Sequence, residues 1–163
     1  MNTISVETHS VEETVALGRV LGELLGPGDV VALVGPLGAG KTYFTKGIAL
    51  GLGVDESSQV ISPSFVLVRE HAGRCVLRHV DAYRLHHPRE LIELGSEELF
   101  DEAGVTVMEW ADRFPPGAVP TTLDVRLSHV GLQDRSIVLS ARDGRGEELL
   151  RSLRQARATQ PRH

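Results

Sequence analysis

The stretch Gly35-Pro36-Leu37-Gly38-Ala39-Gly40-Lys41-Thr42 matches the phosphate-binding loop pattern (Walker A) G-x-x-x-x-G-K-[ST] at every fixed position. Glycines in such a loop let backbone N–H groups turn inward and surround the phosphates of a nucleotide. Lys41 is expected to reach the β- and γ-phosphates, and the Thr42 hydroxyl is expected to bind Mg²⁺. The stretch therefore predicts a nucleotide-binding site, with Tyr43 directly after it as a further candidate.

The segments on either side of this loop have the patterns of a strand and a helix. Residues 30–34 form a short, continuous apolar run, as expected of a strand that is buried on both faces of a parallel sheet. Residues 43–50 are predicted to form a helix whose N-terminus points at the phosphates. A glycine-rich turn with an unrelated lysine would not need these neighbours, so the context favours nucleotide binding.

The composition is that of an ordinary globular protein and argues against several classes of function. The chain has 163 residues, enough for one domain, and 41% of them are hydrophobic. A net charge of -5 argues against a protein that holds DNA or RNA by a broad basic surface. An aromatic content of 4% leaves few side chains on which bases could stack. No apolar run approaches the length of a membrane span, and the N-terminus lacks a signal-peptide pattern. We therefore expect a cytoplasmic protein with no membrane partner.

Hydrophobic periodicity and turn residues predict one α/β domain over residues 1–158, with a disordered tail at 159–163. Besides the strand at 30–34, strands are predicted at residues 3–8, 65–70, 74–80, 105–108, 122–130 and 135–141. The short turn at 72–73 makes the strands around it antiparallel, and the last two strands look like a second antiparallel pair. We expect a P-loop NTPase fold, in which helices flank a sheet of mixed parallel and antiparallel strands.

Helices are also predicted elsewhere in the chain, before, between and after these strands. Ser10 and Glu13 have the spacing of a capping box, and the helix after them has an apolar face that consists of Val11, Val15, Gly18, Leu21 and Leu25. Two short helices are predicted at 88–94 and 96–103, with Gly104 past the end of the second. A last helix at 146–158 has leucines on one side and three arginines on the other, which we interpret as a solvated face rather than a tRNA contact.

A phosphate-loop protein needs an acidic residue at the end of a strand to hold Mg²⁺, usually through water. Two residues meet this description: Glu109 follows the apolar strand 105–108, and Asp81 follows the strand 74–80. Both are expected at the edge of the sheet beside the phosphate loop. The alternative for either one is a solvated carboxylate just past a strand.

Further candidates lie near these acids in the sequence. Ser62 or Ser64 is in the region that becomes a γ-phosphate-sensing switch in small nucleotide hydrolases, although a Ser-Pro turn is as good a reading. Arg84 can neutralise phosphoryl charge or pair with an acid. His79 can orient Asp81, polarise a water or be a plain strand histidine. Trp110, next to Glu109, is either a wall of the nucleotide pocket or a core residue.

The only asparagine is Asn2, so the guanine-selecting N-K-x-D signature of small GTPases is absent. This absence favours ATP over GTP as the nucleotide.

The chain resembles the TsaE (YjeE) family of small P-loop ATPases. The resemblance rests on four blocks: residues 35–42, Ser62-Pro63-Ser64-Phe65, His79-Val80-Asp81-Ala82-Tyr83-Arg84-Leu85 and Val107-Met108-Glu109-Trp110. The phosphate loop alone is unspecific, whereas the H-x-D-x-Y-R-L and E-W blocks in this order are specific. The resemblance extends from about residue 3 to residue 141 and leaves out the last helix.

The resemblance implies a role in forming threonylcarbamoyladenosine on bacterial tRNA, with ATP and Mg²⁺ as cofactors. It implies TsaB and TsaD homologues as partners and contact with tRNA only through their complex, where ATP hydrolysis drives or resets the complex. Lys41 and Thr42 would bind phosphate and Mg²⁺, and Glu109 would be the second Mg²⁺ contact. Asp81 would be needed for hydrolysis, and Ser64 would stand where a threonine is usual.

The sequence departs from the family pattern at three positions. Pro36 stands where an acidic residue is usual, Tyr43 where a second threonine is usual, and Ala111 where a proline commonly follows the E-W pair. None of these changes removes a phosphate or metal ligand. Two other functions remain open: a small-metabolite kinase of the same fold, for which 88–103 is the only candidate substrate segment, and a nucleotide-binding module without turnover.

Overall fold

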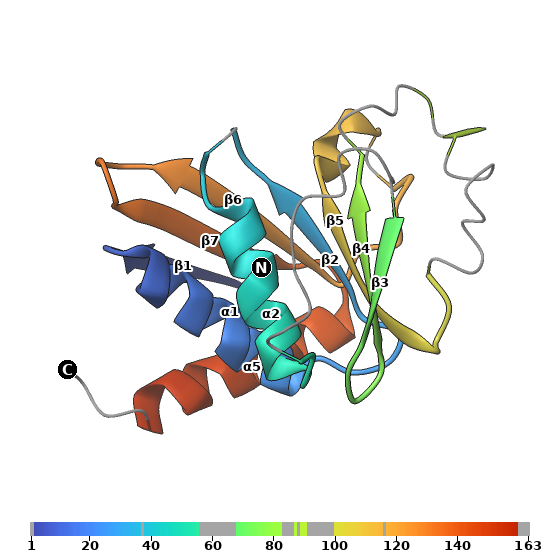
Figure 1. The fold of residues 1–163 in the computed structure, drawn as a ribbon, viewed down its shortest axis with the longest axis horizontal. Coiled ribbons are helices and arrows are strands. Elements are labelled where there is room, and N and C mark those ends of the chain that lie inside the picture. Colours follow the sequence, from blue (N-terminus) through green and yellow to red (C-terminus); the bar gives the residue numbers. More distant parts are fainter. Residues whose placement is uncertain are drawn as a thin grey trace.

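A single mixed sheet organises the protein in a computed structural model, which describes residues 2–36, 38–55, 68–82, 87, 89–90, 100–115 and 117–159 (Figure 1). Seven strands of the described residues form it: β1 (Thr3–Thr8), β2 (Val30–Val34), β3 (Val68–Ala72), β4 (Val76–Asp81), β5 (Gly104–Glu109), β6 (Leu123–His129) and β7 (Arg135–Ala141). Their order across the sheet is β1-β7-β6-β2-β5-β4-β3. The predicted α/β fold with a mixed sheet is confirmed.

The parallel part of the sheet lies at its centre. β2 pairs in parallel with both β5 and β6, and β4 pairs in parallel with β5. The β3–β4, β6–β7 and β1–β7 pairs are antiparallel, so the two hairpins expected from the sequence are confirmed. All residues of β2 are buried, as its continuous apolar sequence predicted. Because parallel strands share a direction, β2, β4 and β5 end at one edge of the sheet.

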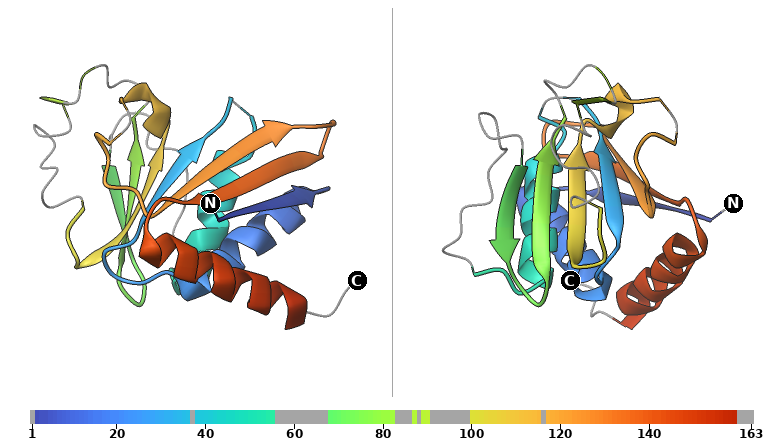
Figure 2. Two further views of the ribbon diagram at one scale, coloured as in Figure 1. Left: turned by 180° about the vertical axis from the view of Figure 1, so that it is seen from behind. Right: turned by 90° about the vertical axis from the view of Figure 1, so that its right-hand side faces the viewer.

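Three helices of the described residues, α1 (Val11–Leu24), α2 (Lys41–Gly51) and α5 (Gly144–Thr159), cover one face of this sheet (Figures 1 and 2). A short 3₁₀ helix, η1 (Ala111–Arg113), follows β5. None of the helices seen in the described residues combines the length and the apolar character that crossing a membrane requires. The core between helices and sheet contains the large apolar side chains Phe44, Leu21, Ile48, Leu77 and Leu139.

The start of α1 is capped nearly as predicted. The Ser10 hydroxyl accepts a hydrogen bond from the Glu13 N–H at 3.1 Å. The Glu13 carboxylate reaches back one residue further than in a standard capping box, because it accepts from the His9 N–H at 2.5 Å rather than from Ser10. The predicted apolar face of α1 was partly wrong, since the Val11 side chain is 41% exposed.

Gly104 does not follow a helix, as the sequence analysis expected, but is the first residue of β5. Residues 100–103 form turns, while the rest of the two helices predicted at 88–94 and 96–103 lies outside the described residues apart from 89–90. A Cβ atom on Gly104 would lie 2.3 Å from the carbonyl oxygen of Val76 on β4. The glycine therefore allows two strands to approach closely. In the sequence alone, a glycine with this role cannot be told from one that ends a helix.

The contact between α1 and α2 depends on four glycines. Gly18 and Gly22 on α1 face backbone carbonyls of α2, and Gly47 and Gly51 on α2 face backbone carbonyls of α1. A Cβ atom at any of them would lie 2.1–2.3 Å from the opposing oxygen. The two helix backbones are therefore in direct contact, and no larger residue fits between them.

We predict that Gly47→Ala lowers the free energy of unfolding by about 1–3 kcal/mol, because its Cβ atom would overlap the Val15 carbonyl oxygen at 2.1 Å. An alanine in a helix otherwise stabilises by up to about 1 kcal/mol relative to glycine, so a loss of stability would come from the overlap between the two helices. The matched control is Gly144→Ala in α5, where nothing lies within 4 Å of the added Cβ atom. Urea denaturation measures both, and equal effects of the two variants would contradict close helix packing.

Candidate active site

The phosphate loop joins the C-terminal end of β2 to the first residue of α2. Gly38 and Gly40 have φ angles of 77° and 99°, a backbone region that favours glycine. At Gly35 a Cβ atom would lie 2.4 Å from the Leu127 carbonyl oxygen of β6. The backbone conformation therefore requires glycine at these three positions. Glycine-rich turns of this kind direct backbone N–H groups toward a bound anion. Leu37, which the sequence analysis included in the site, lies outside the described residues.

Lys41 lies folded back against its own loop. Its Nζ donates hydrogen bonds to the carbonyl oxygens of Gly35 and Pro36, and it lies 3.5 Å from the centre of the Trp110 ring. Burial lowers the pKa of the Lys41 ammonium from its ordinary value, and the charges of Glu109, Asp112 and Asp81 oppose that shift. The ammonium is therefore held at the loop in a field of three acids, and no carboxylate of the described residues is in ion-pair contact with it.

The two acids that the sequence analysis proposed lie next to each other. Asp81 ends β4 and Glu109 ends β5, and the two residues are direct neighbours in the parallel register. Adjacent strands are about 4.8 Å apart, and neighbouring residues in register point to the same face of a sheet. Asp81 is 8% exposed and Glu109 is 2% exposed, so the alternative of two solvated carboxylates is wrong.

His79 contacts Glu109 rather than Asp81. Its Nε2 atom lies 2.5 Å from Oε2 of Glu109, and both side chains are buried. The sequence analysis had suggested that His79 orients the acid two residues further along its own strand. Alternation along a strand does put both side chains on one face, but the histidine reaches across to the neighbouring strand instead.

Trp110 follows Glu109 in an unusual backbone conformation, with φ 63° and ψ 33°. It is the only described residue other than glycine with a positive φ. Its N–H donates to the Leu33 carbonyl oxygen at 3.0 Å, which ties the end of β5 to β2. The ring lies by Lys41 and also packs against a small apolar cluster that contains Val80, Met108 and Phe114. The contacts support the reading of Trp110 as a packing residue, and a wall of the nucleotide pocket stays a prediction.

The residues at this edge suit Mg²⁺ better than a transition metal. The described residues contain no group of three or more His, Cys, Asp or Glu side chains that forms a ready-made metal site. Mg²⁺ is typically held by one or two carboxylates together with substrate phosphates and water, so a complete protein cage is not required. Thr42 at the start of α2, with Glu109 and Asp81, supplies oxygen atoms of the right kind beside the phosphate loop.

A pocket of about 350 Å³ opens on one side of the phosphate loop. Its walls come from the start of α1, the phosphate loop and the turn between β6 and β7. Three apolar side chains line it while being exposed: Val11 at 41%, Tyr43 at 47% and Leu132 at 99%. Sequence reasoning missed Val11 and Leu132, because Val11 fits the apolar face of a helix and Leu132 sits in an ordinary turn.

Two contacts hold the walls of this pocket together. The Arg135 guanidinium donates to the Gly38 carbonyl oxygen at 3.3 Å, and His9 Nδ1 lies 2.8 Å from an Asp134 carboxylate oxygen. The hydrogen bond with Asp134 raises the pKa of His9 above its ordinary value. The stability from this pair is therefore fully present below about pH 6.5 and is lost as the pH rises through the raised pKa. The β6–β7 turn is thus attached both to the loop and to the segment before α1.

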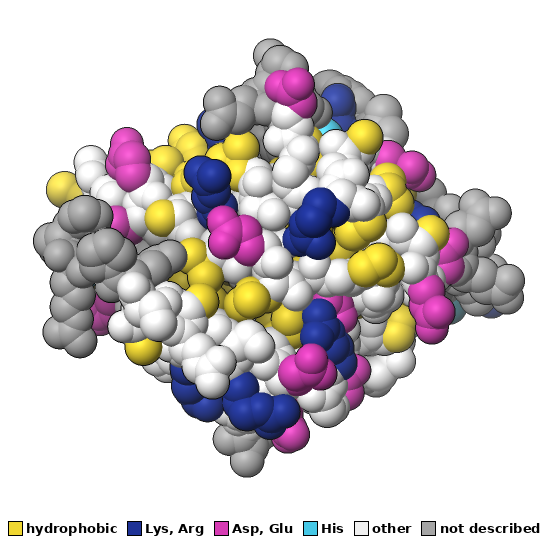
Figure 3. All heavy atoms as spheres, turned by 90° about the horizontal axis from the view of Figure 1, so that it is seen from below, with side chains coloured by type: hydrophobic (Ala, Val, Ile, Leu, Met, Phe, Trp, Pro, Cys, Tyr) yellow, Lys and Arg dark blue, Asp and Glu magenta, His cyan; other side chains and the backbone are white. Residues whose placement is uncertain are grey.

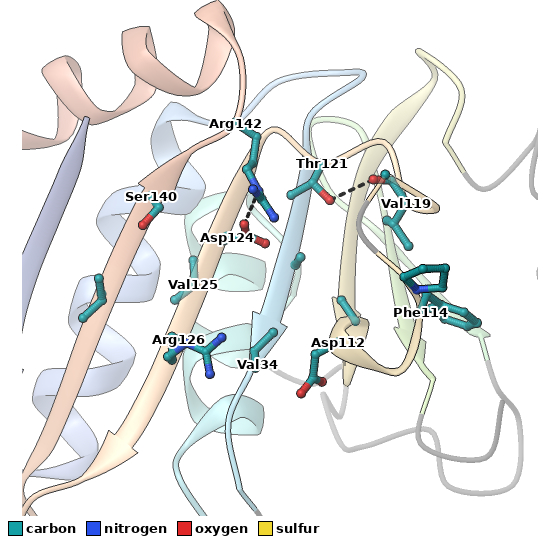
Figure 4. A pocket seen from close by; sticks show the side chains of 15 residues that line it. Val34, Asp112, Phe114, Val119, Thr121, Asp124, Val125, Arg126, Ser140 and Arg142 are labelled. Atoms are coloured by element: carbon teal, nitrogen blue, oxygen red, sulfur yellow. Dashed lines mark hydrogen bonds and ion pairs between the residues drawn. The ribbon is translucent and has the colours of Figure 1, made fainter. Parts of the chain in front are cut away.

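A second hollow, of about 370 Å³, lies on the face of the sheet opposite the three helices (Figure 4). Figure 4 shows Arg126 and Asp112 on either side of Val34, and an ion pair between Asp124 and Arg142. None of the described phosphate-loop residues lines this hollow. It is therefore separate from the phosphate site, although Val34 directly precedes the loop.

Charged side chains of both signs are interspersed on the face seen in Figure 3, among the residues described there. The three arginines expected on the last helix, Arg151, Arg154 and Arg157, are exposed on α5. Arg154 donates to the Thr3 carbonyl oxygen at 3.0 Å, so it ties α5 to β1. On the face seen in Figure 3, charges of both signs are therefore mixed among the described residues.

The remaining sequence candidates lie outside the described residues. They are Ser62, Ser64 and the segment Tyr83-Arg84-Leu85.

Comparison with known proteins places this geometry in a family. Residues 8–137 match the family model of TsaE, described as threonylcarbamoyl adenosine biosynthesis protein TsaE. The chain is 47% identical to the "tRNA threonylcarbamoyladenosine biosynthesis protein TsaE" of Mycobacterium leprae, over 80% of this chain and 85% of that protein. It is 36% identical to the protein of the same name from Bacillus subtilis, over 94% and 95% of the two chains.

The fold has a solved counterpart as well. The crystal structure of Bacillus subtilis YdiB superposes with a TM-score of 0.82 at 33% sequence identity, covering 96% of this chain and 97% of that one. The family model spans the phosphate loop, both acids, His79 and Trp110. From this match and from the relatives of similar length, we conclude that the chain belongs to the TsaE family.

Proposed function

We propose that this protein is the Mg²⁺-dependent ATPase subunit of the machinery that forms threonylcarbamoyladenosine on tRNA. The observation that supports this most is the phosphate loop with its buried Lys41 facing the adjacent carboxylates of Asp81 and Glu109. Relatives at 36–47% identity carry the name of that biosynthesis. A cytoplasmic location follows from the proposal, because tRNA is modified there.

Each residue of the site has a task in this proposal. Lys41 leaves the carbonyl oxygens of its own loop and donates to the β- and γ-phosphates of ATP, where negative charge concentrates during phosphoryl transfer. Thr42 and Glu109 would hold Mg²⁺, which would supply positive charge that neutralises the phosphates. Asp81 orients the attacking water. Ser64 stays a candidate for the γ-phosphate-sensing segment.

The pocket beside the loop is proposed to hold the nucleoside part of ATP. Val11, Tyr43 and Leu132 present apolar surface from three different segments, as a flat base requires. An apolar wall does not by itself distinguish bases, but the chain also lacks the N-K-x-D signature that reads guanine. We therefore propose that ATP and ADP bind better than GTP, with Trp110 close to the phosphates rather than to the base.

Homologues of TsaB and TsaD are the proposed partners, and tRNA is contacted only through them. Purified protein with Mg·ATP, alone and then with TsaB and TsaD homologues, tests the proposal. Hydrolysis that appears or rises with these partners supports it. Transfer of phosphate to a small metabolite, with no effect of the partners, would favour a kinase instead, and nucleotide binding without any turnover would leave only a binding module.

We predict that Lys41→Ala lowers partner-stimulated ATP hydrolysis by about 10²–10³-fold, because it removes a positive donor aimed at the transition-state charge. Lys46→Ala is the matched control, since Lys46 is exposed on the same helix and lines a different surface groove. Phosphate release measures both variants. Wild-type turnover in the Lys41 variant would rule out this role of the loop.

We predict that Leu132→Ser weakens ADP binding by about 3–10-fold without changing the free energy of unfolding. The side chain is 99% exposed, so its loss removes contact with the nucleoside but no core packing. Val130→Ser is the control, because Val130 is 53% exposed in the same turn and does not line the pocket. Titration calorimetry compares the two, and equal ADP affinities would show that the nucleoside binds elsewhere.

A further inference from the structure

His79 is a fully buried histidine with one strong polar contact. Its side chain is 0% exposed, and its Nε2 atom lies 2.5 Å from Glu109 Oε2. The other ring nitrogen, Nδ1, is buried and has no hydrogen-bond partner among the described residues. The two side chains come from neighbouring parallel strands, β4 and β5.

The chemistry of this contact defines where the ring proton lies. An ionised carboxylate oxygen can only accept a hydrogen bond, so the hydrogen between the two groups belongs to Nε2 of His79. Nδ1 is then the bare nitrogen of the ring, which needs no acceptor. His79 thus donates to Oε2 of Glu109 and leaves its other oxygen, Oε1, for a different contact.

His79 has apolar neighbours along its own strand and on β5, while its register neighbour on β3 is Arg69. Leu77 precedes it on the same face of β4, and its direct neighbour on β5 is Val107. A buried polar ring among such residues costs free energy unless a hydrogen bond compensates, and a valine or leucine would pack there without that cost. Burial of the histidine is therefore explained by the bond with Glu109 and not by packing.

Glu109 needs such a partner. It is 2% exposed, and the buried carboxylate of Asp81 is its neighbour across the parallel register. Two like charges about one strand spacing apart repel, and a glutamate has three rotatable side-chain bonds through which it can turn away. The bond from His79 opposes this turning, because it gives the buried carboxylate a hydrogen-bond donor and restricts the side chain to one orientation.

We propose that His79 is a positioning residue, which holds Glu109 so that Oε1 faces the Mg²⁺ position beside Thr42. This inference rests on the proposed function of Glu109 as the metal contact. The arrangement follows a general rule, in which partners behind a ligand orient it and their loss costs about 10–100-fold in metal affinity. His79 also makes the two acids unequal, since this bond goes to Glu109 and not to Asp81.

A matched pair of variants tests the role of His79. In His79→Gln the amide nitrogen reaches the place of Nε2 and keeps a donor for Glu109, whereas in His79→Asn the amide nitrogen reaches only the place of Nδ1. The dissociation constant of ADP is measured by calorimetry in Mg²⁺ and in EDTA, and the EDTA value divided by the Mg²⁺ value is the magnesium factor.

We expect His79→Asn to lower the magnesium factor by about 10-fold and His79→Gln by less than about 3-fold, with ADP affinity in EDTA unchanged in both. In a Glu109→Gln background, His79→Asn should cause no further loss, since the bond acts only through Glu109. Equal magnesium factors for the wild type and the two single variants would overturn the inference while leaving the proposed function intact. Wild-type protein with no ADP binding, or with a magnesium factor of one, would overturn the proposed metal role as well.

A measurement on the wild type covers the case in which neither variant folds. In ¹H–¹⁵N spectra of the imidazole region, the Nε2–H signal of His79 should be visible, because the proton is buried and hydrogen-bonded. Adding Mg²⁺ to the ADP complex should shift this signal, because Glu109 then gains a positively charged neighbour. A signal that does not respond to Mg²⁺ would overturn the role of His79.

Discussion

The backbone contact of α1 with α2 is the constraint on which the nucleotide site depends. Four glycines allow each helix to rest on carbonyl oxygens of the other, so neither helix can shift without overlap. α2 begins at Lys41, and β2, which ends at Val34, is held in the centre of the sheet between β5 and β6. The phosphate loop therefore connects two ends whose positions are both set by packing, which is how a flexible glycine-rich segment acquires one shape.

Strand direction supplies the second half of the site. Since β2, β4 and β5 are parallel, the phosphate loop, Asp81 and Glu109 all emerge at the same edge of the sheet. β7 and β1 widen the sheet on one side of this parallel part, and β3 widens it on the other. The β6–β7 turn, however, is attached to the loop through Arg135 and to the start of α1 through His9 and Asp134. An edge of parallel strands thus carries the proposed phosphate and metal site, and the β6–β7 turn forms a wall of the pocket proposed for the nucleoside.

Lys41 and Glu109 both have internal contacts at this edge before any ligand binds. Lys41 is buried with its ammonium on two carbonyl oxygens and the Trp110 ring, and burial lowers the pKa of this group while three nearby acids oppose the shift. Glu109 is compensated by His79. A nucleotide with Mg²⁺ adds both negative and positive charge, so it can exchange these internal contacts for its own without leaving an unpaired group.

Short sequence patterns were enough to predict the local features of this protein. Patterns of a few neighbouring residues predict the phosphate loop, the buried strand before it, the two hairpins and the acids at strand ends. Backbone geometry and hydrophobic periodicity act over this short range. The order of the strands in the sheet became known only from the tertiary structure. It brought His79 to Glu109 instead of Asp81, turned an apparent helix stop at Gly104 into a close strand contact, and exposed Val11 beside Leu132. These outcomes depend on residues that are far apart in the chain, and pairing between distant segments is set by the packing of the whole sheet and its helices rather than by any local pattern.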